Sequence, residues 1–175
     1  NEFYVLDLLM TEVKGVPRPA GVVAYELATG ELHVFQGKSI IFATGSFGKI
    51  YKTTSNAHTL TGDGVGIVWR KGLPLEDMEF FQFHPTALDH PSMPRPLLSE
   101  ALRGHGALLR DANGERFVDE LLPRDVVSRA ITARMLDQDI DHVWLDATQL
   151  DHFHIRFPTI AADLEAAGLD PSVDY

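Results

Sequence analysis

The feature that most constrains the fold is a short apolar run that leads directly into a turn containing glycine. The run Ser39–Ala43 holds two isoleucines and a phenylalanine in succession, and Gly45 and Gly48 follow it closely. A continuous apolar run of this length is typical of a strand buried on both faces, as in a parallel sheet. Small residues after such a strand let the backbone approach a ligand, although many α/β turns without a ligand share this pattern.

The residue pattern divides the chain into a β-rich first part and a mixed second part, with a boundary near residues 75–80. Pro17 and Pro19 are expected to interrupt the first β-structure, because proline cannot donate a ladder hydrogen bond. The fold class predicted is α/β followed by α+β. The expected strands are Phe3–Thr11, Val22–Leu27, Glu31–Phe35, Ser39–Ala43, Met78–Phe83, Ala107–Leu109, Phe117–Val118 and Val143–Leu145. The expected helices are Gly62–Lys71, Leu97–Arg103, Arg124–Asp137 and Ile160–Ala167.

The composition narrows the possible functions. The 175 residues carry 25 acidic and 15 basic side chains, which disfavours nucleic-acid binding because that requires a basic surface. Without cysteine the chain has no disulfide, thiolate metal site or cysteine nucleophile. No apolar stretch reaches the roughly 18 residues that a transmembrane helix needs. We therefore predict no membrane span and a cytoplasmic location.

Both ends of the sequence read as interrupted elements. The first residues already have the pattern of a strand, and the last ones, through Tyr175, carry no helix cap. We therefore expect an internal piece of a longer chain, with parts of two domains rather than one complete domain.

An acidic residue lies between two glycines at the expected start of a helix. Asp63 is flanked by Gly62 and Gly64. As an N-cap, its carboxylate would satisfy free backbone N–H groups and suit the positive end of the helix dipole. The same carboxylate is also suited to accept a hydrogen bond from a cofactor hydroxyl, and the two roles are compatible.

Several polar residues follow a histidine that is held in place by proline. His84 ends an apolar run and precedes Pro85. Ser99, Glu100 and Arg103 come next, on a predicted short helix. A lone histidine in such a place is more often structural, and Glu100 with Arg103 fits an ordinary i,i+3 ion pair. Together, however, these residues also fit a site for an anion.

Arg124 lies in the first turn of the clearest predicted helix, where the helix dipole disfavours a cation. Its planar guanidinium is therefore a candidate for a specific contact with an anion. Asp125 offsets part of the unfavourable charge, so a plain surface role fits equally well. The His152 and His154 pair raises the question of a metal ion. Since no third ligand stands at a suitable spacing, we predict no metal site.

The order and spacing of these segments resemble the succinate dehydrogenase/fumarate reductase flavoprotein group across essentially the whole chain. Each shared string alone is modest, and the ordered set carries the resemblance. Members of the group bind FAD in a Rossmann-like domain and close a capping domain over it. The resemblance therefore implies a partial FAD-binding domain in residues 1–77 and most of a capping domain in residues 78–175. The shared strings are Ala43–Gly45, Gly62–Gly64, Phe81–Thr86, Ser99–Gly104, Gly114–Phe117 and Pro123–Ala130.

The resemblance implies a set of residues beside the FAD: Ala43, Thr44, Gly45 and Asp63. Ser46 stands where the group has a second glycine, which narrows the approach of the backbone to the cofactor. The sequence also lacks the Gly-x-Gly-x-x-Gly phosphate cradle, so we expect these residues alone neither to hold FAD tightly nor to turn over substrate. An incomplete FAD-binding domain would leave apolar surface uncovered, and we expect self-association through the first part of the chain.

For the second part, the resemblance implies that His84, Ser99 and Glu100 line the site of a dicarboxylate substrate. It implies that Arg124 moves a proton. Because the pKa of arginine exceeds about 12, this role needs a neighbouring carboxylate, for which Glu100 is the candidate, and a carboxylate clamp is the alternative role. His105 replaces the glutamate that the group usually has between two glycines, which leaves a supporting role at this position open.

Within the group, the sequence is most similar to L-aspartate oxidases. Leu102 stands before Arg103 where the dehydrogenases usually carry cysteine. Pro123 stands before Arg124 where they often carry serine. The reaction implied is FAD-dependent oxidation of L-aspartate to iminoaspartate, which is the first step of NAD biosynthesis through quinolinate. Hydride passes from the substrate α-carbon to flavin N5, and oxygen or fumarate is the final acceptor. The alternatives are a succinate dehydrogenase or fumarate reductase flavoprotein subunit, and a non-catalytic acidic interaction module.

Overall fold

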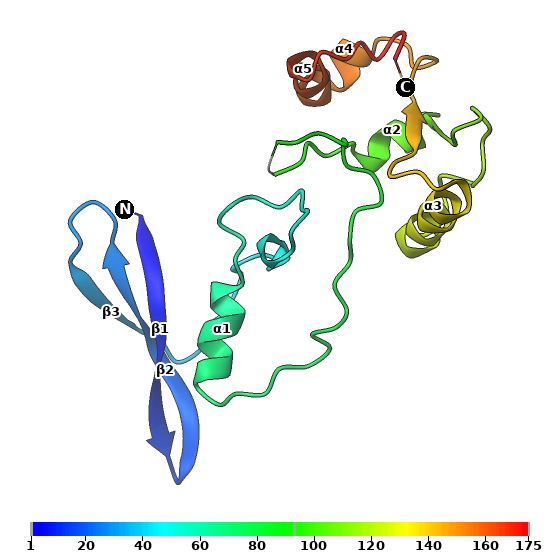
Figure 1. Ribbon diagram of the computed structural model, residues 1–175. Helices are drawn as coiled ribbons and strands as arrows, with labels where there is room; N and C mark the ends of the chain where they lie inside the picture. The colour runs from blue at the N-terminus through cyan, green and yellow to red at the C-terminus, as the bar shows by residue number, and fades with distance from the viewer. Residues whose placement is uncertain (1, 93, 175) are drawn as a thin grey trace. The chain divides into compact units, whose positions relative to one another are not determined.

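The computed structural model describes residues 2–92 and 94–174, which form two compact units (Figure 1). The first unit runs to Lys52 and continues over Ala57–Phe80. The second comprises Thr53–Asn56 and the chain from Phe81 onward. The structure confirms a mixture of helices and strands, while the finer description, a Rossmann-like part followed by a capping part, stays a prediction. In the described part of the chain, no helix is long and apolar enough to cross a membrane.

The first unit is built on a three-stranded antiparallel sheet with the order β1 (Phe3–Val13), β2 (Val16–Glu26) and β3 (Leu32–Gln36). A two-residue turn joins β1 to β2. Its residues, Lys14 and Gly15, have φ values of 53° and 77°, and positive φ at both positions is what a type I′ hairpin turn requires.

Pro17 and Pro19 lie inside β2, so the expectation that they interrupt the strand is wrong. Val13 pairs with Val16 across the turn, and hydrogen-bonded positions alternate along an antiparallel pair. The two prolines therefore occupy positions at which an N–H would point away from β1. On the other side of β2, β3 pairs only with Gly21–Tyr25, so no neighbour there needs a donor from either proline.

A second correction concerns Ser39–Ala43, which forms no strand. Ile41 is 90% exposed. A strand buried on both faces needs neighbouring strands and a covering layer, and none of the described strands pairs with this segment. All strand pairs among the described residues are antiparallel, so the predicted parallel sheet is absent from them.

The 3₁₀-helix η1 (Gly48–Ile50) and the helix α1 (Asp63–Arg70) complete the first unit. The α1 bounds agree closely with the predicted helix. Helix α1 packs against β1, and an ion pair of 2.5 Å between Lys71 Nζ and Asp7 Oδ2 joins the end of the helix to the strand.

The second unit has two apolar clusters. One gathers around Leu102, Phe153 and Leu164, and the other around Leu109, Val127 and Ile131. The elements are α2 (Glu100–Gly104), β4 (Leu108–Arg110), α3 (Arg124–Gln138), β5 (Trp144–Asp146), α4 (Phe153–Arg156) and α5 (Pro158–Ala166). Strands β4 and β5 pair with each other in an antiparallel sense.

Two further predicted strands are absent. Met78–Phe83 is irregular, with Phe80 78% exposed and no partner strand in the described chain. Phe117–Val118 is also irregular, and only an isolated bridge between Arg110 and Arg116 follows the predicted turn. The turn itself is confirmed, because the buried Asp111 carboxylate accepts hydrogen bonds from nearby backbone N–H groups and closes it.

Candidate active site

The most developed polar cluster lies in the second unit, where the start of α3 meets the start of α2. Pro123 precedes α3, and Arg124 is the first residue of the helix, as predicted. The Arg124 Nε and Nη2 atoms donate hydrogen bonds of 2.9 and 2.7 Å to a single oxygen, Oε2 of Glu100. Arg124 Nη1 also lies 3.5 Å from Oε1 of Gln82. The structure thus joins Arg124 and Glu100 across 24 positions of sequence.

Glu100 is the first residue of α2, and Ser99 is its N-cap. The Ser99 Oγ accepts a hydrogen bond of 3.3 Å from the N–H of Ala101, so the hydroxyl hydrogen is not used in that bond. Hydrogen bonds from Arg124 are the main reason that the pKa of Glu100 is lowered from its ordinary value. Glu100 is therefore ionised near neutral pH, and half of its side chain faces solvent.

Arg103 is buried, which the sequence did not predict, although its pattern grouped Arg103 with His84, Ser99 and Glu100 as fitting a site for an anion. Its Nη1 donates to the backbone oxygen of Glu120 at 2.7 Å, and its Nη2 lies 3.8 Å from Oε1 of Glu100. Among the described residues, neither Nε nor Nη2 has a hydrogen-bond partner. A buried guanidinium with unpaired N–H groups is suited to bind an anion. The i,i+3 spacing from Glu100 predicted the ion pair, and the grouping with His84 and Ser99 predicted a part in an anion site.

His84 completes the cluster. Its Nδ1 lies 2.9 Å from the carbonyl oxygen of Thr86 and 3.2 Å from the Thr86 nitrogen. Burial is the largest cause that lowers the pKa of His84, and the positive charges of Arg124 and Arg103 lower it further. The shorter contact is to a carbonyl oxygen, which can only accept, so Nδ1 carries a hydrogen and donates to Thr86. The other ring nitrogen of His84 is then an acceptor in the neutral ring and a donor when the ring is protonated.

These residues do not line the cavity found in the second unit. The second unit contains a cavity of about 440 Å³, lined by Leu98, Trp144 and neighbouring residues. His84, Ser99, Glu100 and Arg124 are not among its lining residues, and all four are half-buried. The arrangement combines two guanidinium groups, one imidazole and one hydroxyl around a single carboxylate. Such a donor set can bind carboxylate groups of a small molecule and can exchange a proton with it.

In the first unit, the predicted cofactor residues lie at the start of α1. The expectation that Asp63 caps this helix is wrong, since Gly62 is the N-cap with φ of 83°, and no side chain caps the helix. Instead, the Asp63 carboxylate accepts hydrogen bonds from the Tyr4 hydroxyl at 2.7 Å and the Thr61 hydroxyl at 2.9 Å. The hydrogen bond from Tyr4 is the largest cause that lowers the pKa of Asp63.

The loop Ala43–Gly45 lies against the start of the same helix. The Thr44 side chain fits so closely against Gly64 that a Cβ at that glycine would lie 2.1 Å from Thr44 Oγ1. Gly45 has φ of 76°, which favours glycine. The loop itself is exposed. An exposed loop beside a carboxylate and the uncapped start of a helix fits the hydroxyl and phosphate groups of a dinucleotide.

The two departures from the resembled pattern have local explanations. The Ser46 Oγ accepts a hydrogen bond of 3.1 Å from the N–H of Gly48, so this side chain turns back onto its own loop. His105 packs edge-on against Phe157, with ring centroids 5.3 Å apart, and its Nδ1 lies 2.8 Å from the oxygen of Ala101. His105 thus has a structural contact at the end of α2.

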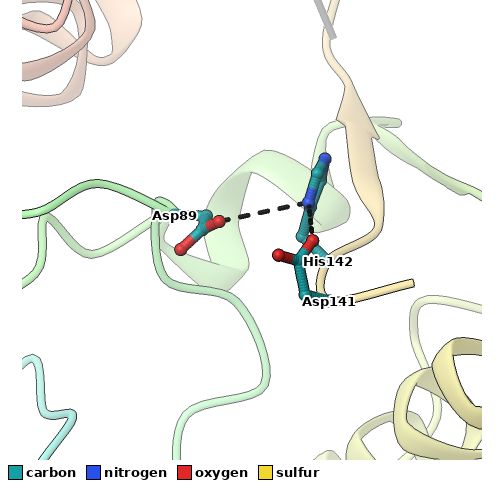
Figure 2. Close-up of side chains that lie close together, drawn as sticks. All are labelled: Asp89, Asp141 and His142. Atoms are coloured by element: carbon teal, nitrogen blue, oxygen red, sulfur yellow. Dashed lines mark hydrogen bonds and ion pairs between the residues drawn. The ribbon is translucent and has the colours of Figure 1, made fainter. Parts of the chain in front are cut away.

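One group of metal-ligating side chains lies elsewhere in the second unit, formed by Asp89, Asp141 and His142 (Figure 2). The three groups already have partners. Arg95 Nη1 donates a 2.6 Å hydrogen bond to Asp89, and His142 Nδ1 lies 2.7 Å from Asp141. Asp89 and Asp141 are exposed, and a nearby guanidinium opposes a cation. This group differs from the His152 and His154 pair considered from the sequence.

Comparison with known proteins identifies the class. A model of the family described as FAD binding domain matches residues 1–174. The chain therefore belongs to this flavoprotein family, which includes succinate dehydrogenases and fumarate reductases, and FAD is its cofactor. Membership of this family supports a role as a FAD-dependent oxidoreductase.

Individual relatives carry two names at the same level of similarity. A Streptomyces coelicolor protein named L-aspartate oxidase is 42% identical over 95% of this chain and 31% of its own length. A Rickettsia conorii succinate dehydrogenase flavoprotein subunit is 42% identical over 97% of this chain and 30% of its own length. The chain thus spans about a third of the curated relatives that it matches.

Solved structures agree with this assignment. A quinol-fumarate reductase with menaquinol molecules is 31% identical, with a TM-score of 0.82 over 97% of this chain and 33% of its own. Mycobacterium smegmatis Sdh1 in complex with UQ1 is 32% identical, with a TM-score of 0.68 over 98% of this chain and 30% of its own.

Proposed function

We propose that the protein containing these residues oxidises L-aspartate to iminoaspartate with FAD. The observation that carries the proposal is the joined cluster of His84, Glu100, Arg103 and Arg124, in which two guanidinium groups surround one carboxylate. A substrate with two carboxylates needs such cationic donors. The names of the relatives refer to aspartate, succinate and fumarate, which are all four-carbon dicarboxylates.

Three groups are suited to hold the substrate carboxylates. The buried Arg103 offers the unpaired N–H groups described above. Ser99 offers a hydroxyl hydrogen, and His84 offers its second ring nitrogen as a donor when the ring is protonated. Together these donors would fix the α-carbon of the substrate in one orientation, which is the main contribution that a protein makes to cofactor chemistry.

Arg124 and Glu100 are suited to handle the proton that the amino group of the substrate loses. A guanidinium alone is a poor base. Its two hydrogen bonds to one oxygen of Glu100 provide a carboxylate that can receive the proton through the pair. When bound, FAD supplies the two-electron acceptor for the hydride of the α-carbon, and oxygen or fumarate takes the electrons from it. The Ala43–Gly45 loop and Asp63 would hold FAD through backbone groups and a carboxylate.

Two residues favour aspartate over succinate as the substrate. Leu102 and Pro123 are the positions at which the sequence is similar to the oxidases and differs from the usual dehydrogenase pattern. In the structure, Leu102 is buried in the core of the second unit, and Pro123 sets the first turn of α3. The equal identity to a succinate dehydrogenase makes succinate oxidation or fumarate reduction the second candidate.

An assay of the complete gene product decides between these functions. With L-aspartate and oxygen, we expect hydrogen peroxide and the ammonia that iminoaspartate releases on hydrolysis. With succinate and an artificial electron acceptor, we expect at least tenfold slower turnover. Faster turnover of succinate would support the second candidate. No turnover of either substrate by flavin-loaded protein would support a non-catalytic module.

Four further expectations accompany this function. We propose that residues 1–77 belong to the FAD-binding domain and residues 78–175 to a capping domain. We also propose a cytoplasmic location and no binding of nucleic acid. Residues 1–175 by themselves are expected not to retain FAD, and a stoichiometric flavin absorbance spectrum of that purified polypeptide would contradict this.

Self-association of the isolated polypeptide is supported by its exposed apolar side chains. Val34 on β3 is 59% exposed, and Ile41 in the loop that follows is 90% exposed. Association would remove this surface from water. Light scattering of residues 1–175 should therefore give a mass above that of the monomer, which rises with concentration. A constant monomer mass of 19.4 kDa would contradict the expectation.

A further inference from the structure

The two hydrogen bonds to Asp63 reach the same oxygen atom. The Tyr4 hydroxyl and the Thr61 hydroxyl both donate to Oδ2, at 2.7 and 2.9 Å. No hydrogen bond to Oδ1 is found within the described residues. One oxygen of the carboxylate is thus held by the protein, and the other is presented at the exposed start of α1.

The two donors differ in what they connect. Thr61 belongs to the same turn as Asp63, so its hydrogen bond is local. Tyr4 lies 59 positions away on β1, so its hydrogen bond ties the start of α1 to the sheet. Asp7 of the same strand binds Lys71 at the other end of the helix. Strand β1 therefore contacts α1 at both ends.

A β-bulge explains how one strand makes both contacts. The register between β1 and β2 shifts between Val5 and Asp7, which leaves Leu6 as an extra residue. Side chains alternate between the faces of a regular strand, so Tyr4 and Asp7 would point to opposite faces. The extra residue brings Asp7 to the same face as Tyr4. Both polar groups can then reach α1.

We propose that Tyr4 is a positioning residue for the cofactor: by holding Oδ2 of Asp63, it directs the other carboxylate oxygen toward a cofactor hydroxyl. The inference rests on the proposed function, in which Asp63 contacts FAD. Tyr4 touches no cofactor atom in this scheme. It acts through the orientation and the charge of the Asp63 carboxylate, since the ionised form is the better acceptor.

The charge of Asp63 provides a readout that simple loss of packing would not change. The hydrogen bond from Tyr4 is the largest cause that lowers the pKa of Asp63. In a Tyr4→Phe variant, that pKa should rise toward its ordinary value. Acidification would then protonate Asp63 at a higher pH, so FAD should be released at a higher pH than from the unmodified protein.

The experiment compares three variants of the complete gene product after removal of flavin. FAD is titrated into each protein, and binding is followed by quenching of flavin fluorescence between pH 8 and pH 4. Tyr4→Phe should weaken FAD binding about three- to tenfold, as expected for the net contribution of one hydrogen bond that acts indirectly, and should raise the pH of release. Tyr25→Phe is the matched control, because Tyr25 pairs with Tyr4 across the sheet and gives Asp63 no hydrogen bond. It should change binding less than twofold.

The third variant separates failure of this inference from failure of the proposed function. Asp63→Asn should weaken FAD binding more than Tyr4→Phe does. If Asp63→Asn binds FAD normally, the proposed placement of FAD is wrong, and the role of Tyr4 falls with it. If Asp63→Asn binds weakly while Tyr4→Phe matches the unmodified protein in affinity and in pH of release, only the role of Tyr4 is overturned.

Discussion

The two candidate sites of this chain are held in place by different means. At the proposed cofactor site of the first unit, the close fit of Thr44 against Gly64 fixes the loop to the helix. At the proposed substrate site of the second unit, charged side chains from separate segments hold one another, as Arg124 and Glu100 do. The first site should therefore be sensitive to added volume, and the second to lost charge.

The two units also differ in how deeply they bury charged side chains. Much of the sheet of the first unit is exposed, and few of its side chains are fully buried. The second unit buries Arg103 and Glu120 at 2% and 3% exposure. Burying ionised groups is costly unless they are paired or hydrogen-bonded. The second unit therefore places its polar groups in a fixed network, whereas the first leaves its Asp63 carboxylate exposed.

The largest effect is expected from removal of the Arg124 guanidinium. Arg124→Ala should lower turnover of the preferred substrate about 10²- to 10⁴-fold, because both the proton route and a cationic donor are lost. Arg129→Ala is the control, since Arg129 lies on the same helix in an exposed pair with Asp125. Turnover by the control should be unchanged.

The Arg124→Lys variant separates the two roles of this residue. Lysine keeps the positive charge but cannot reproduce the pair of hydrogen bonds that the guanidinium donates to Glu100. A proton role predicts a large fall in kcat and an altered pH profile. A carboxylate clamp predicts mainly a higher KM. Full activity of Arg124→Ala would contradict both roles and would favour the non-catalytic alternative.

A large loss of stability is expected in the second unit from Glu120→Ala. The Glu120 carboxylate accepts hydrogen bonds from the N–H of Leu109 and from Arg116, and the variant leaves that buried N–H unsatisfied. The free energy of unfolding should fall by about 3 kcal/mol. Trp144 lies in the second unit and Trp69 in the first, so urea unfolding followed by Trp144 fluorescence in a Trp69→Phe background reports on the correct unit.

The exposed neighbour Asp119 provides the control for this prediction. Its side chain is 59% exposed and lies 3.9 Å from Arg116. Asp119→Ala should cost less than about 1 kcal/mol, as surface ion pairs usually do. Equal losses from the two variants would show that burial of Glu120 does not decide its contribution, and the proposed contrast between the units would fail.

Substitutions at two glycines of α1 test whether close packing holds the first unit together. Gly64→Ala should destabilise this unit by about 1–3 kcal/mol, because the new Cβ meets the Thr44 side chain. Gly66→Ala should be neutral or stabilise by up to about 1 kcal/mol, because its Cβ would meet only a flexible arginine atom at 3.4 Å. Trp69 fluorescence in a Trp144→Phe background measures both. If the two substitutions behave alike, the close fit does not hold the loop.

Sequence patterns predicted the local elements of this fold well and the partners of those elements poorly. Helix α3 and the turn at Asp111 follow from periodicity and turn chemistry. Ser39–Ala43 and Met78–Phe83 were predicted as strands because of their apolar runs. An apolar run reports that a segment favours burial, and it does not report whether a neighbouring strand is present. Without such a neighbour in the described chain, both segments are irregular.

The candidate site shows the same limit. Motif order placed Arg124, Glu100 and His84 in one group, and the structure brings these three together. The motif order could not predict the hydrogen bond from Tyr4 to Asp63, because nothing in the local sequence marks a contact over 59 positions. The burial of Arg103 was missed for the same reason, since it depends on the backbone of Glu120 in a distant loop.

The smallest effect is expected in the acid dependence of stability. Asp146 is buried, and despite that burial its pKa is lowered by hydrogen bonds from Thr148 and Arg110, the latter 2.6 Å long. Because the folded pKa lies below the unfolded one, this stabilisation is complete above the ordinary pKa and is lost as the pH falls through the folded pKa. Acidification from pH 7 to pH 3 should therefore cost the second unit at most about 1 kcal/mol through this group, because pH 3 lies less than one unit below the ordinary pKa. Asp146→Asn should be less stable at pH 7 and should lose correspondingly less on acidification. Urea unfolding at each pH measures the effect. If the pH dependence of this variant is unchanged, the charge of Asp146 does not stabilise the second unit. The contrast between the two units would then rest on Glu120 and Arg103 alone.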